Sequence, residues 1–188
     1  MPIPDHEPAE LNPTASVILG MLSFSPKSGY EIKSFVDRTT RFFWAASYGQ
    51  IYPELRRLAD AGLIEGSDEP QGGRRRTVYS LTDAGREALE AWLMTPPELF
   101  EMRHEGMLKL FFAGSLPPRE QVARLHDMRR VHAEKLAALR AIEPAAAQKP
   151  ESFPYLVLRF GIEFNEWAVD WCDRNAAALE SRAAERST

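Results

Sequence analysis

The chain has 188 residues, enough for one sizeable domain or two small ones, and its 44% hydrophobic and 27% charged residues are typical of a soluble protein. The acidic first ten residues lack the apolar core of a signal peptide, and no apolar run approaches the roughly 18 residues of a membrane span. The single cysteine, Cys172, excludes an internal disulfide and a cysteine-based zinc site. We therefore expect a cytoplasmic protein with no membrane partner.

Charge is distributed unevenly along the chain. The formal net charge of −4 argues mildly against nucleic-acid binding, because the phosphate backbone attracts positive charge. Residues 12–86, however, hold ten Lys and Arg against eight Asp and Glu, a net charge of +2, and both flanking segments are acidic. DNA binding by this segment should therefore be weak for a monomer and steeply salt-dependent, and a dimer would double the contacts.

The first part of the chain predicts a lead-in followed by two helices. Residues 1–12 are typical of a disordered terminus. Thr14 is suited to cap a helix from Ala15 to Phe24 that is apolar nearly all round and therefore buried. After a turn at residues 25–29, the pattern from Tyr30 to Thr39 predicts an amphipathic helix. Three consecutive aromatic residues follow, which we expect to pack under the next helix: Phe42, Phe43 and Trp44.

The stretch from Ser47 to Glu65 predicts a helix with two different faces. Three residues at helical spacing form an apolar stripe: Ile51, Leu55 and Leu58. Ser47 is suited to be the N-cap, and Gly62 ends the periodic run. The opposite face carries amide, phenol and guanidinium groups, which can bond to bases or hold phosphates: Gln50, Arg56 and Arg57 beside Gly49 and Pro53, with Tyr52 on the flank. This composition indicates a DNA recognition helix.

Two observations weigh against that interpretation. Pro53 would remove a backbone hydrogen bond from the helix interior, unless the regular helix begins nearer Gln50. A solvated amphipathic helix with two arginines is also ordinary, so the helix alone does not establish DNA binding. The segment that follows Gly62 favours the functional interpretation.

That segment predicts a β-hairpin with a basic strand end. Leu63 to Glu65 is short and apolar, and the alternating run from Thr77 to Leu81 suits a strand. Between them Pro70 and two glycines, Gly72 and Gly73, form a turn that is followed by three arginines: Arg74, Arg75 and Arg76. A run of charges is usually a solvated surface. Directly after a helix–turn–helix pattern, it is better interpreted as a wing that contacts phosphates or the minor groove.

The second half of the chain predicts further helices. A fourth helix, Asp83 to Leu93 with Thr82 as its cap, ends at Thr95-Pro96-Pro97, which marks a domain boundary. We assign residues 13–95 to a DNA-binding domain and residues 98–188 to a helical C-terminal domain. Three helices and one loop are predicted after the boundary: helices from Phe100 to Ala113, Arg119 to Ile142 and Phe153 to about Ala184, and a loop from Glu143 to Ser152.

The last predicted helix is apolar on two sides. One side follows coiled-coil-like steps of four and three residues: Phe153, Val157, Phe160, Phe164, Trp167 and Trp171. The other side holds a second strip: Leu158, Ile162, Val169 and Cys172. One side can pack on its own domain and leave the other for a partner subunit, and symmetric dimers are the commonest oligomers. We place the dimer interface on the first set, although the pattern alone leaves open which side meets the partner, and we expect Cys172 to be a buried thiol.

Ligand, metal and catalytic chemistry have less support. A small aromatic effector could be lined by aromatic side chains, of which the candidates are Trp92, Phe100, Phe111 and Tyr155, but such residues at helical spacing more often form core. His126 and His132 are six residues apart and do not align on a helix face. The chain has no HExxH, GxSxG, P-loop or GxGxxG pattern. We therefore expect no metal site, no cofactor and no enzymatic activity.

These segments resemble the PadR-type transcriptional regulators. The resemblance covers about residues 14–94 and is carried by five segments in family order: GYEIK at Gly29–Lys33, FFW at Phe42–Trp44, YGQIYPELRRLADAGLI at Tyr48–Ile64, GGRRRTVYSLTDAGREAL at Gly72–Leu89, and Trp92-Leu93. The helical tail is similar in length and pattern to the larger C-terminal domain of one subgroup. The resemblance implies a mainly α fold, in which a winged helix–turn–helix domain with a two-stranded wing precedes an all-helical dimerisation domain.

The resemblance also implies roles for individual residues. By position, Tyr30, Ser47, Gln50 and Tyr52 match residues that read DNA, whereas the arginines Arg56, Arg57 and Arg74–Arg76 match cations that contact the backbone. Proline is accepted by the family at the position of Pro53. The family implies a homodimer that represses neighbouring genes from a double-stranded, pseudo-palindromic operator, and some members respond to phenolic acids or aromatic drugs.

Two other classes of function stay open. The acidic net charge motivates a winged-helix protein–protein module without DNA binding, which would ignore duplex DNA even at low salt. A carrier of aromatic ligands built on the helical tail would bind its ligand with no change in DNA affinity. Our leading hypothesis is a dimeric DNA-binding repressor released by a small aromatic or phenolic effector.

Overall fold

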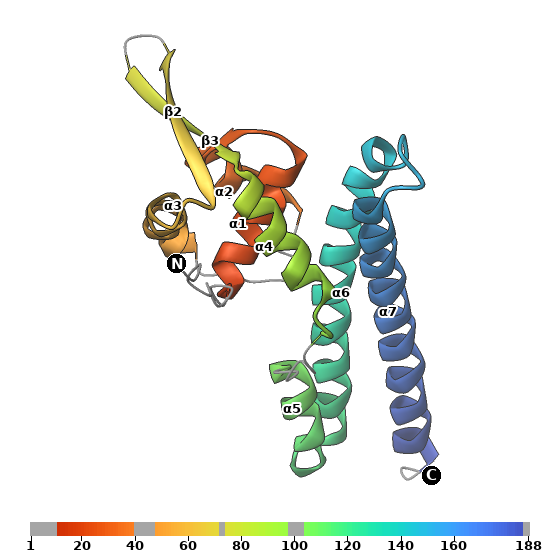
Figure 1. Ribbon diagram of the computed structural model, residues 1–188. Coiled ribbons are helices and arrows are strands. Elements are labelled where there is room, and N and C mark those ends of the chain that lie inside the picture. Colours follow the sequence, from red (N-terminus) through yellow and green to blue (C-terminus); the bar gives the residue numbers. More distant parts are fainter. Residues whose placement is uncertain (1–10, 40–47, 72–73, 98–103, 186–188) are drawn as a thin grey trace. The chain divides into compact units, whose positions relative to one another are not determined.

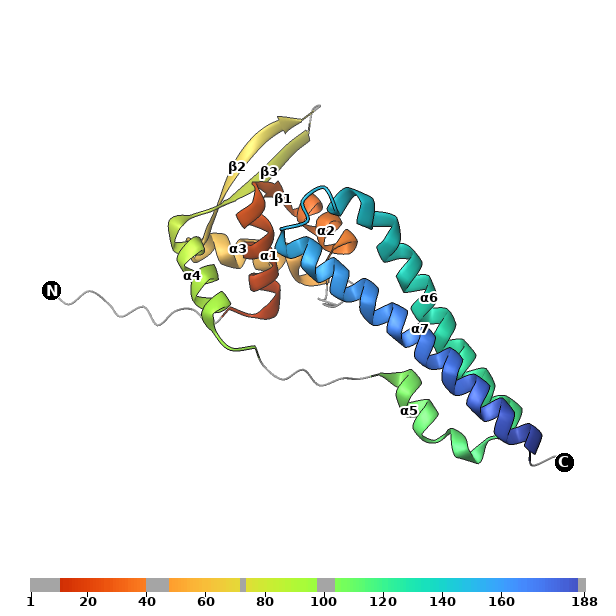
Figure 2. The same ribbon diagram turned by 90° about the vertical axis from the view of Figure 1, so that its right-hand side faces the viewer.

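The computed structural model describes residues 11–39, 48–71, 74–97 and 104–185. The chain divides into two compact units, Met1–Leu99 and Phe100–Thr188, so the division falls just after Thr95-Pro96-Pro97. The first unit contains helices around a small sheet, and the second is helical (Figures 1 and 2). The predicted fold class, mainly α with a small β-wing, is confirmed.

Helix α1 (Pro13–Phe24) begins earlier than the predicted cap, Thr14. Asn12 is the N-cap, because its side-chain oxygen accepts a hydrogen bond from the Ala15 N–H at 2.9 Å. The prediction that Thr14 caps this helix is wrong; Thr14 lies inside the first turn and is buried. Asn and Thr both suit a cap, and Pro13 at the first helical position decides between them, since proline is favoured there. The helix is buried, as predicted from its apolar composition.

Helix α2 (Gly29–Arg38) follows a strand that the sequence analysis missed. Residues Lys27–Ser28 form β1, where a turn was predicted, because they pair with the wing strand β3. Ser28 then caps α2, and the Glu31 carboxylate accepts a hydrogen bond from the Ser28 backbone N–H, which makes a capping box. The predicted aromatic group Phe42–Trp44 and the predicted cap Ser47 lie outside the described residues.

Helix α3 (Ile51–Asp60) follows a short 3₁₀ turn, η2 (Tyr48–Gln50). Because Gln50 is the N-cap, Pro53 lies in the first turn, where its missing N–H removes no hydrogen bond from the helix. The helix ends as predicted: Gly62 has a φ of +70°, which favours glycine. The Gly62 and Leu63 N–H groups donate to the last turn of α3, to the carbonyls of Ala59 at 2.9 Å and Leu58 at 3.0 Å. This closure directs the chain into the sheet.

The wing is longer than predicted. Strands β2 (Ile64–Gln71) and β3 (Arg74–Leu81) pair antiparallel from Ile64↔Leu81 to Gln71↔Arg74, and the sheet order is β1-β3-β2. The alternation of apolar residues marked only the base of the hairpin, because most side chains of the outer β2 strand are exposed and polar. Helix α4 (Asp83–Met94) follows, capped by Thr82 as predicted.

The core of the first unit joins these elements. It is made of buried side chains from α1, α2, α3, the strands and α4: Ala15, Ile18, Leu19, Met21, Leu22, Ile32, Val36, Ile51, Leu55, Leu58, Ile64, Leu81 and Leu89. The three residues of the predicted stripe on α3 are all in this list. One face of α3 is therefore fixed in the core and the other points to solvent.

The second unit is a helical hairpin with a short helix beside it. It consists of α5 (Glu105–Phe111), the 3₁₀ turn η3 (Ala113–Ser115), α6 (Pro118–Ala146) and α7 (Phe153–Glu185). Helices α6 and α7 lie side by side and run in opposite directions (Figures 1 and 2). Two of the predicted boundaries are wrong. The predicted loop begins too early, since α6 continues to Ala146, and the predicted first helix reaches too far, since α5 ends at Phe111.

The two apolar sides of α7 have different environments. The second strip packs on α6 or into the core, with Leu158, Ile162 and Cys172 buried and Val169 partly buried. The thiol of Cys172 is therefore a core group, as predicted, and burial raises its pKa. The first set is mostly exposed, from Val157 at 42% to Phe153 at 82%; only Trp171 is partly buried, against Leu125 and its neighbours. Within the described residues, no helix is long and apolar enough to cross a membrane.

Candidate nucleic-acid interface

The outward face of α3 presents polar groups to solvent. Gln50, Tyr52, Pro53 and Arg56 are all exposed, and they stand over the buried stripe of the same helix. Because that stripe is anchored in the core, the polar face is held on a rigid element. An amide and a guanidinium on a rigid helix can form paired hydrogen bonds to base edges in a major groove or to phosphates.

Arg57 is held differently from Arg56. Its guanidinium donates to the Glu54 carboxylate, from Nε at 2.9 Å and from Nη2 at 2.6 Å. Glu54 is buried and also accepts a hydrogen bond from the side-chain amide of Asn12, at 3.0 Å. The hydrogen bond from Arg57 to this carboxylate raises the pKa of Arg57. The positive charge of Arg57 is therefore largely balanced within the protein, and Arg56 is the freer cation of the pair.

The start of α2 lies against the start of α3. Tyr30 is 72% exposed, the most exposed aromatic side chain described in the first unit. Gly29, beside it, approaches the ring of Tyr52 so closely that a β-carbon at position 29 would lie 2.7 Å from Cε1 of Tyr52. Glycine at position 29 thus leaves room for the Tyr52 ring, and the two tyrosines predicted to read DNA lie on neighbouring helix ends.

The wing carries the remaining predicted cations. The backbone of Arg74 and Arg75 starts β3 at the tip, opposite Gln71 and Pro70, while the side chains of these two arginines are outside the described part of the chain. Arg76 is described, and it points inward: its Nη2 donates to Oε2 of Glu31 at 2.5 Å. Of the predicted set, the structure brings Tyr30, Gln50, Tyr52, Arg56 and Arg57 to the ends and outer face of two adjoining helices, and Arg76 to the outer half of the wing.

Two of the predicted effector residues, Phe111 and Tyr155, lie far apart within the second unit. Phe111 is 82% exposed on α5, and its neighbour Leu110 packs with Ala176 near the end of α7. Tyr155 packs at the start of α7 with Leu158. About 30 Å of helix separates residues 155 and 176, since an α-helix rises about 1.5 Å per residue. Trp92 belongs to the first unit and is 44% exposed, and Phe100 is outside the described residues.

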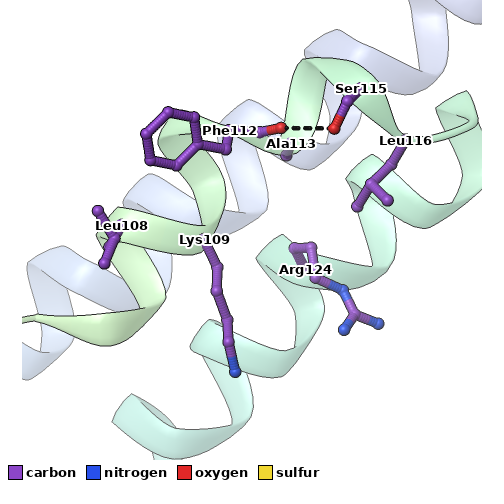
Figure 3. A pocket seen from close by; sticks show the side chains of 7 residues that line it. All are labelled: Leu108, Lys109, Phe112, Ala113, Ser115, Leu116 and Arg124. Carbon is purple, nitrogen blue, oxygen red and sulfur yellow. Dashed lines mark hydrogen bonds between the residues drawn. The ribbon is translucent and has the colours of Figure 1, made fainter.

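The second unit has a hollow between α5 and α6. Its volume is about 470 Å³, and Figure 3 shows its lining: Leu108, Lys109, Phe112, Ala113, Ser115, Leu116 and Arg124. The two cations already have acidic partners, because Lys109 Nζ lies 2.7 Å from Glu105 and Arg124 Nη2 lies 3.3 Å from Asp127. The hollow is open and carries no free charge to select a ligand, so it gives no support to the predicted pocket.

A buried polar pair links α6 to α7. His132 Nδ1 lies 2.9 Å from Oδ1 of Asn165, whose amide nitrogen donates to the Gly161 carbonyl at 2.7 Å. Because the amide is oriented by Gly161, its oxygen faces His132, so the histidine donates through Nδ1. His132 was considered above only as a metal ligand. Among the described residues, no three His, Cys, Asp or Glu side chains gather as metal ligands would.

Sequence reasoning missed the carboxylates that support the site. Glu31 and Glu54 hold Arg76 and Arg57, yet neither was singled out. One signal was present for Glu31, because Ser28 and Glu31 have the S-x-x-E spacing of a capping box. For Glu54 the only signal was its spacing of three residues from Arg57, which is common on helix surfaces.

Comparison with known proteins assigns the chain to a family. Residues 18–91 match the model of the transcriptional regulator PadR-like family, and residues 102–180 match that of the virulence activator alpha C-terminal domain. The negative transcriptional regulator PadR of Bacillus subtilis is 33% identical over 176 residues, which cover 87% of this chain and 95% of that protein. The probable transcriptional regulator Rv1176c of Mycobacterium tuberculosis is 30% identical and covers 88% of this chain and 96% of its own.

Solved structures agree with this assignment. The crystal structure of Bacillus subtilis PadR in complex with operator DNA has a TM-score of 0.80 and 32% identity, over 88% of this chain and 98% of that chain. The same protein in complex with p-coumaric acid has a TM-score of 0.73 and 31% identity, with the same coverage. The Vibrio cholerae virulence activator AphA has a TM-score of 0.68 and 26% identity, over 90% of this chain and 99% of that chain. The chain belongs to the PadR-like family of transcriptional regulators.

Proposed function

We propose that the protein is a homodimeric, DNA-binding repressor that leaves its operator when a small aromatic acid binds. The observation that carries the DNA-binding part is the exposed polar face of α3, with Gln50, Tyr52 and Arg56 above a stripe that is fixed in the core. The similarity to Bacillus subtilis PadR, whose structure in complex with operator DNA is known, also supports DNA binding. The protein would act in the cytoplasm and catalyse no reaction.

The proposed roles on DNA differ between residues. Gln50, Tyr52 and Tyr30, together with Ser47, would read or position the duplex, and Arg56 would anchor a phosphate. Arg74 and Arg75 complete the proposed set of cations that contact DNA, whereas Arg57 and Arg76, which the resemblance also assigns to the backbone, are each paired with a carboxylate in the free protein. The net positive charge of residues 12–86 supports this assignment, since phosphate contacts supply most of the affinity.

The proposed dimer uses the exposed side of α7. Large apolar side chains are left uncovered there over about four turns: Phe153, Val157, Phe160, Phe164 and Trp167. Contiguous exposed apolar surface of this kind marks an interaction site. A two-fold dimer would also place two α3 helices on two half-sites, which a reader of a palindromic operator needs.

The dimer is tested by Phe160→Glu, with Ala177→Glu as the control. Ala177 is exposed on the same helix but outside the apolar set. We expect the first variant to be monomeric and the second dimeric by light scattering after size exclusion. A wild-type monomer, or a Phe160→Glu dimer, would reject this interface.

DNA binding is tested by fluorescence anisotropy on the duplex upstream of the protein's own gene, beside a shuffled duplex, at two salt concentrations. We expect tighter binding to the native duplex and weaker binding at higher salt. Gln50→Ala should relax the preference at one base position, whereas Arg56→Ala and Arg75→Ala should weaken binding to every sequence and flatten the salt slope. A protein that ignores duplex DNA at low salt, on tiled genomic fragments too, would be a protein–protein module instead.

The effector part is supported by the p-coumaric acid complex of Bacillus subtilis PadR. Adding phenolic acids to the preformed DNA complex should lower the anisotropy if an aromatic acid is the effector. Tryptophan fluorescence of the free protein, measured with the same compounds, separates binding from release. Ligand binding with no change in DNA affinity would favour a carrier of aromatic ligands.

A further inference from the structure

The carboxylate of Glu31 joins the helix–turn–helix to the wing. Its Oε2 accepts hydrogen bonds from the backbone N–H and the hydroxyl of Ser28, at 2.8 and 2.9 Å. The same oxygen accepts from Nη2 of Arg76 on β3, at 2.5 Å. One atom at the start of α2 therefore holds both the helix cap and a wing residue that is 45 positions away in the sequence.

Arg76 lies just beyond the part of β3 that pairs with β1. Strand β1 pairs with β3 only at Tyr79 and Val78, and Arg76 is two residues further toward the tip. Side chains alternate along a strand, so Arg76 lies on the same side of β3 as Val78, which is buried. Beyond the rung that pairs Glu69 with Arg76, two paired rungs remain before the tip. An isolated two-stranded hairpin is marginally stable in water. Each side-chain contact near the tip therefore helps to fix the direction in which the wing points.

The environment of Arg76 differs from that of a free surface cation. The side chain is 29% exposed, and its Nε is buried without a hydrogen-bond partner among the described residues. Withdrawing a guanidinium from water is unfavourable unless a partner holds it, and Glu31 is that partner. The Arg76 side chain is therefore held against the protein by Glu31 and does not extend into solvent.

We propose that Glu31 is a positioning residue for DNA binding, which fixes the wing against α2 through Arg76. The inference rests on the proposed DNA-binding function. With the contact formed, the tip that carries Arg74 and Arg75 and the exposed face of α3 are presented to one duplex together. Arg76 acts through Glu31 and does not itself hold a phosphate.

The sign of one charge change tests this inference. Removing a carboxylate near DNA should strengthen binding by charge alone, because repulsion with phosphates is lost. We expect Glu31→Gln to weaken binding by about tenfold instead, since it removes a charge-assisted hydrogen bond that orders the wing. Glu69→Gln is the matched control: Glu69 is exposed and faces Arg76 across the β2–β3 ladder. This control should bind as well as the wild type or more tightly.

A double-mutant cycle separates the indirect role of Arg76 from direct contact. Arg76→Ala should weaken binding about as much as Glu31→Gln, and the double variant should lose no more than either single one. If Arg76 held a phosphate directly, Glu31→Gln would free it and strengthen binding, while Arg76→Ala would weaken binding in both backgrounds. That pattern would overturn the proposal.

Hydrogen exchange tests the contact without DNA. In Glu31→Gln, amides of β2 and β3 should exchange faster, while those of the buried helix α1 keep their wild-type rates. Arg76→Lys, which keeps a cation opposite Glu31, should retain more of the wild-type protection in the wing than Arg76→Ala. Unchanged exchange in the wing would refute the contact whatever the affinities are. If the wild type binds no DNA, the proposed function fails, and faster wing exchange would still establish the contact as structural only, which overturns the DNA role.

Discussion

The packing of Gly85 gives a quantitative prediction for the first unit. Gly85 is the third residue of α4, and a β-carbon built on it would lie 2.0 Å from the carbonyl oxygen of Leu63. That carbonyl cannot move freely, because it accepts the Thr82 N–H at 3.2 Å, while the Thr82 hydroxyl donates to Gly62 at 2.8 Å. Gly85→Ala must therefore push α4 away from the turn that ends α3.

The expected size follows from three contributions. Overpacking of this kind costs about 1–3 kcal/mol. Weakening the hydrogen bond from Thr82 to Leu63 adds about 1 kcal/mol, and the better helix propensity of alanine returns about 1 kcal/mol. The net destabilisation of about 1–3 kcal/mol should lower the melting temperature of the first unit by roughly 4–20 °C, as expected for a domain of up to about 100 residues.

Gly20→Ala is the matched control. Gly20 lies inside α1, and an added β-carbon there meets no atom within 4 Å. The same substitution should therefore stabilise the protein by about 1 kcal/mol, through helix propensity alone. Both variants are compared by circular dichroism and calorimetry of the full chain. If Gly85→Ala melts at or above the wild-type temperature, the close approach of α4 to Leu63 is refuted.

Three further predictions concern other groups. The pKa of Glu31 is lowered from 4.5, mainly by the hydrogen bond from the Ser28 backbone N–H. The stability that this carboxylate contributes is therefore complete above about pH 4.5 and is lost as pH falls through the folded pKa. In a profile of unfolding free energy against pH, the loss of stability in acid should be shallower for Glu31→Gln than for the wild type. Asn165→Ala should cost about 1–3 kcal/mol in urea unfolding, because buried His132 loses its partner. Cys172 should react with a thiol reagent in urea and resist it when folded, because it is buried and its pKa is raised.

The elements that the sequence predicted best are those with a strong local signal. The stripe on α3 and the Gly62 cap depend on periodicity and on one glycine with φ of +70°, and the structure has both. The boundaries were predicted worst where the local signal is weak or misleading. The outer wing contains few apolar residues, so its strand pairing leaves no periodic trace in the sequence, and the last turn of α6 contains Pro144, which favours the end of a helix.

Helix α7 shows a different limit of prediction from sequence. Both sides of this helix are apolar, so periodicity alone could not say which one packs on α6. The structure buries the side with Leu158, Ile162 and Cys172, because only that side also carries Asn165 and small residues that fit against His132 and Leu139. The exposed aromatic side is what remains for a partner, and the proposed dimer follows from this distribution.

Long-range ion pairs change how the charged residues of the candidate site should be understood. The sequence presents Arg57 and Arg76 as equals of Arg56 and Arg75, since arginine content is all that composition reports. In the folded chain two acids select among them: Glu54 neutralises Arg57 within α3, and Glu31 draws Arg76 inward from β3. The cations left for DNA are therefore fewer than the sequence suggests. In the proposed function, the paired arginines instead set the geometry in which Arg56 and the wing tip meet one duplex.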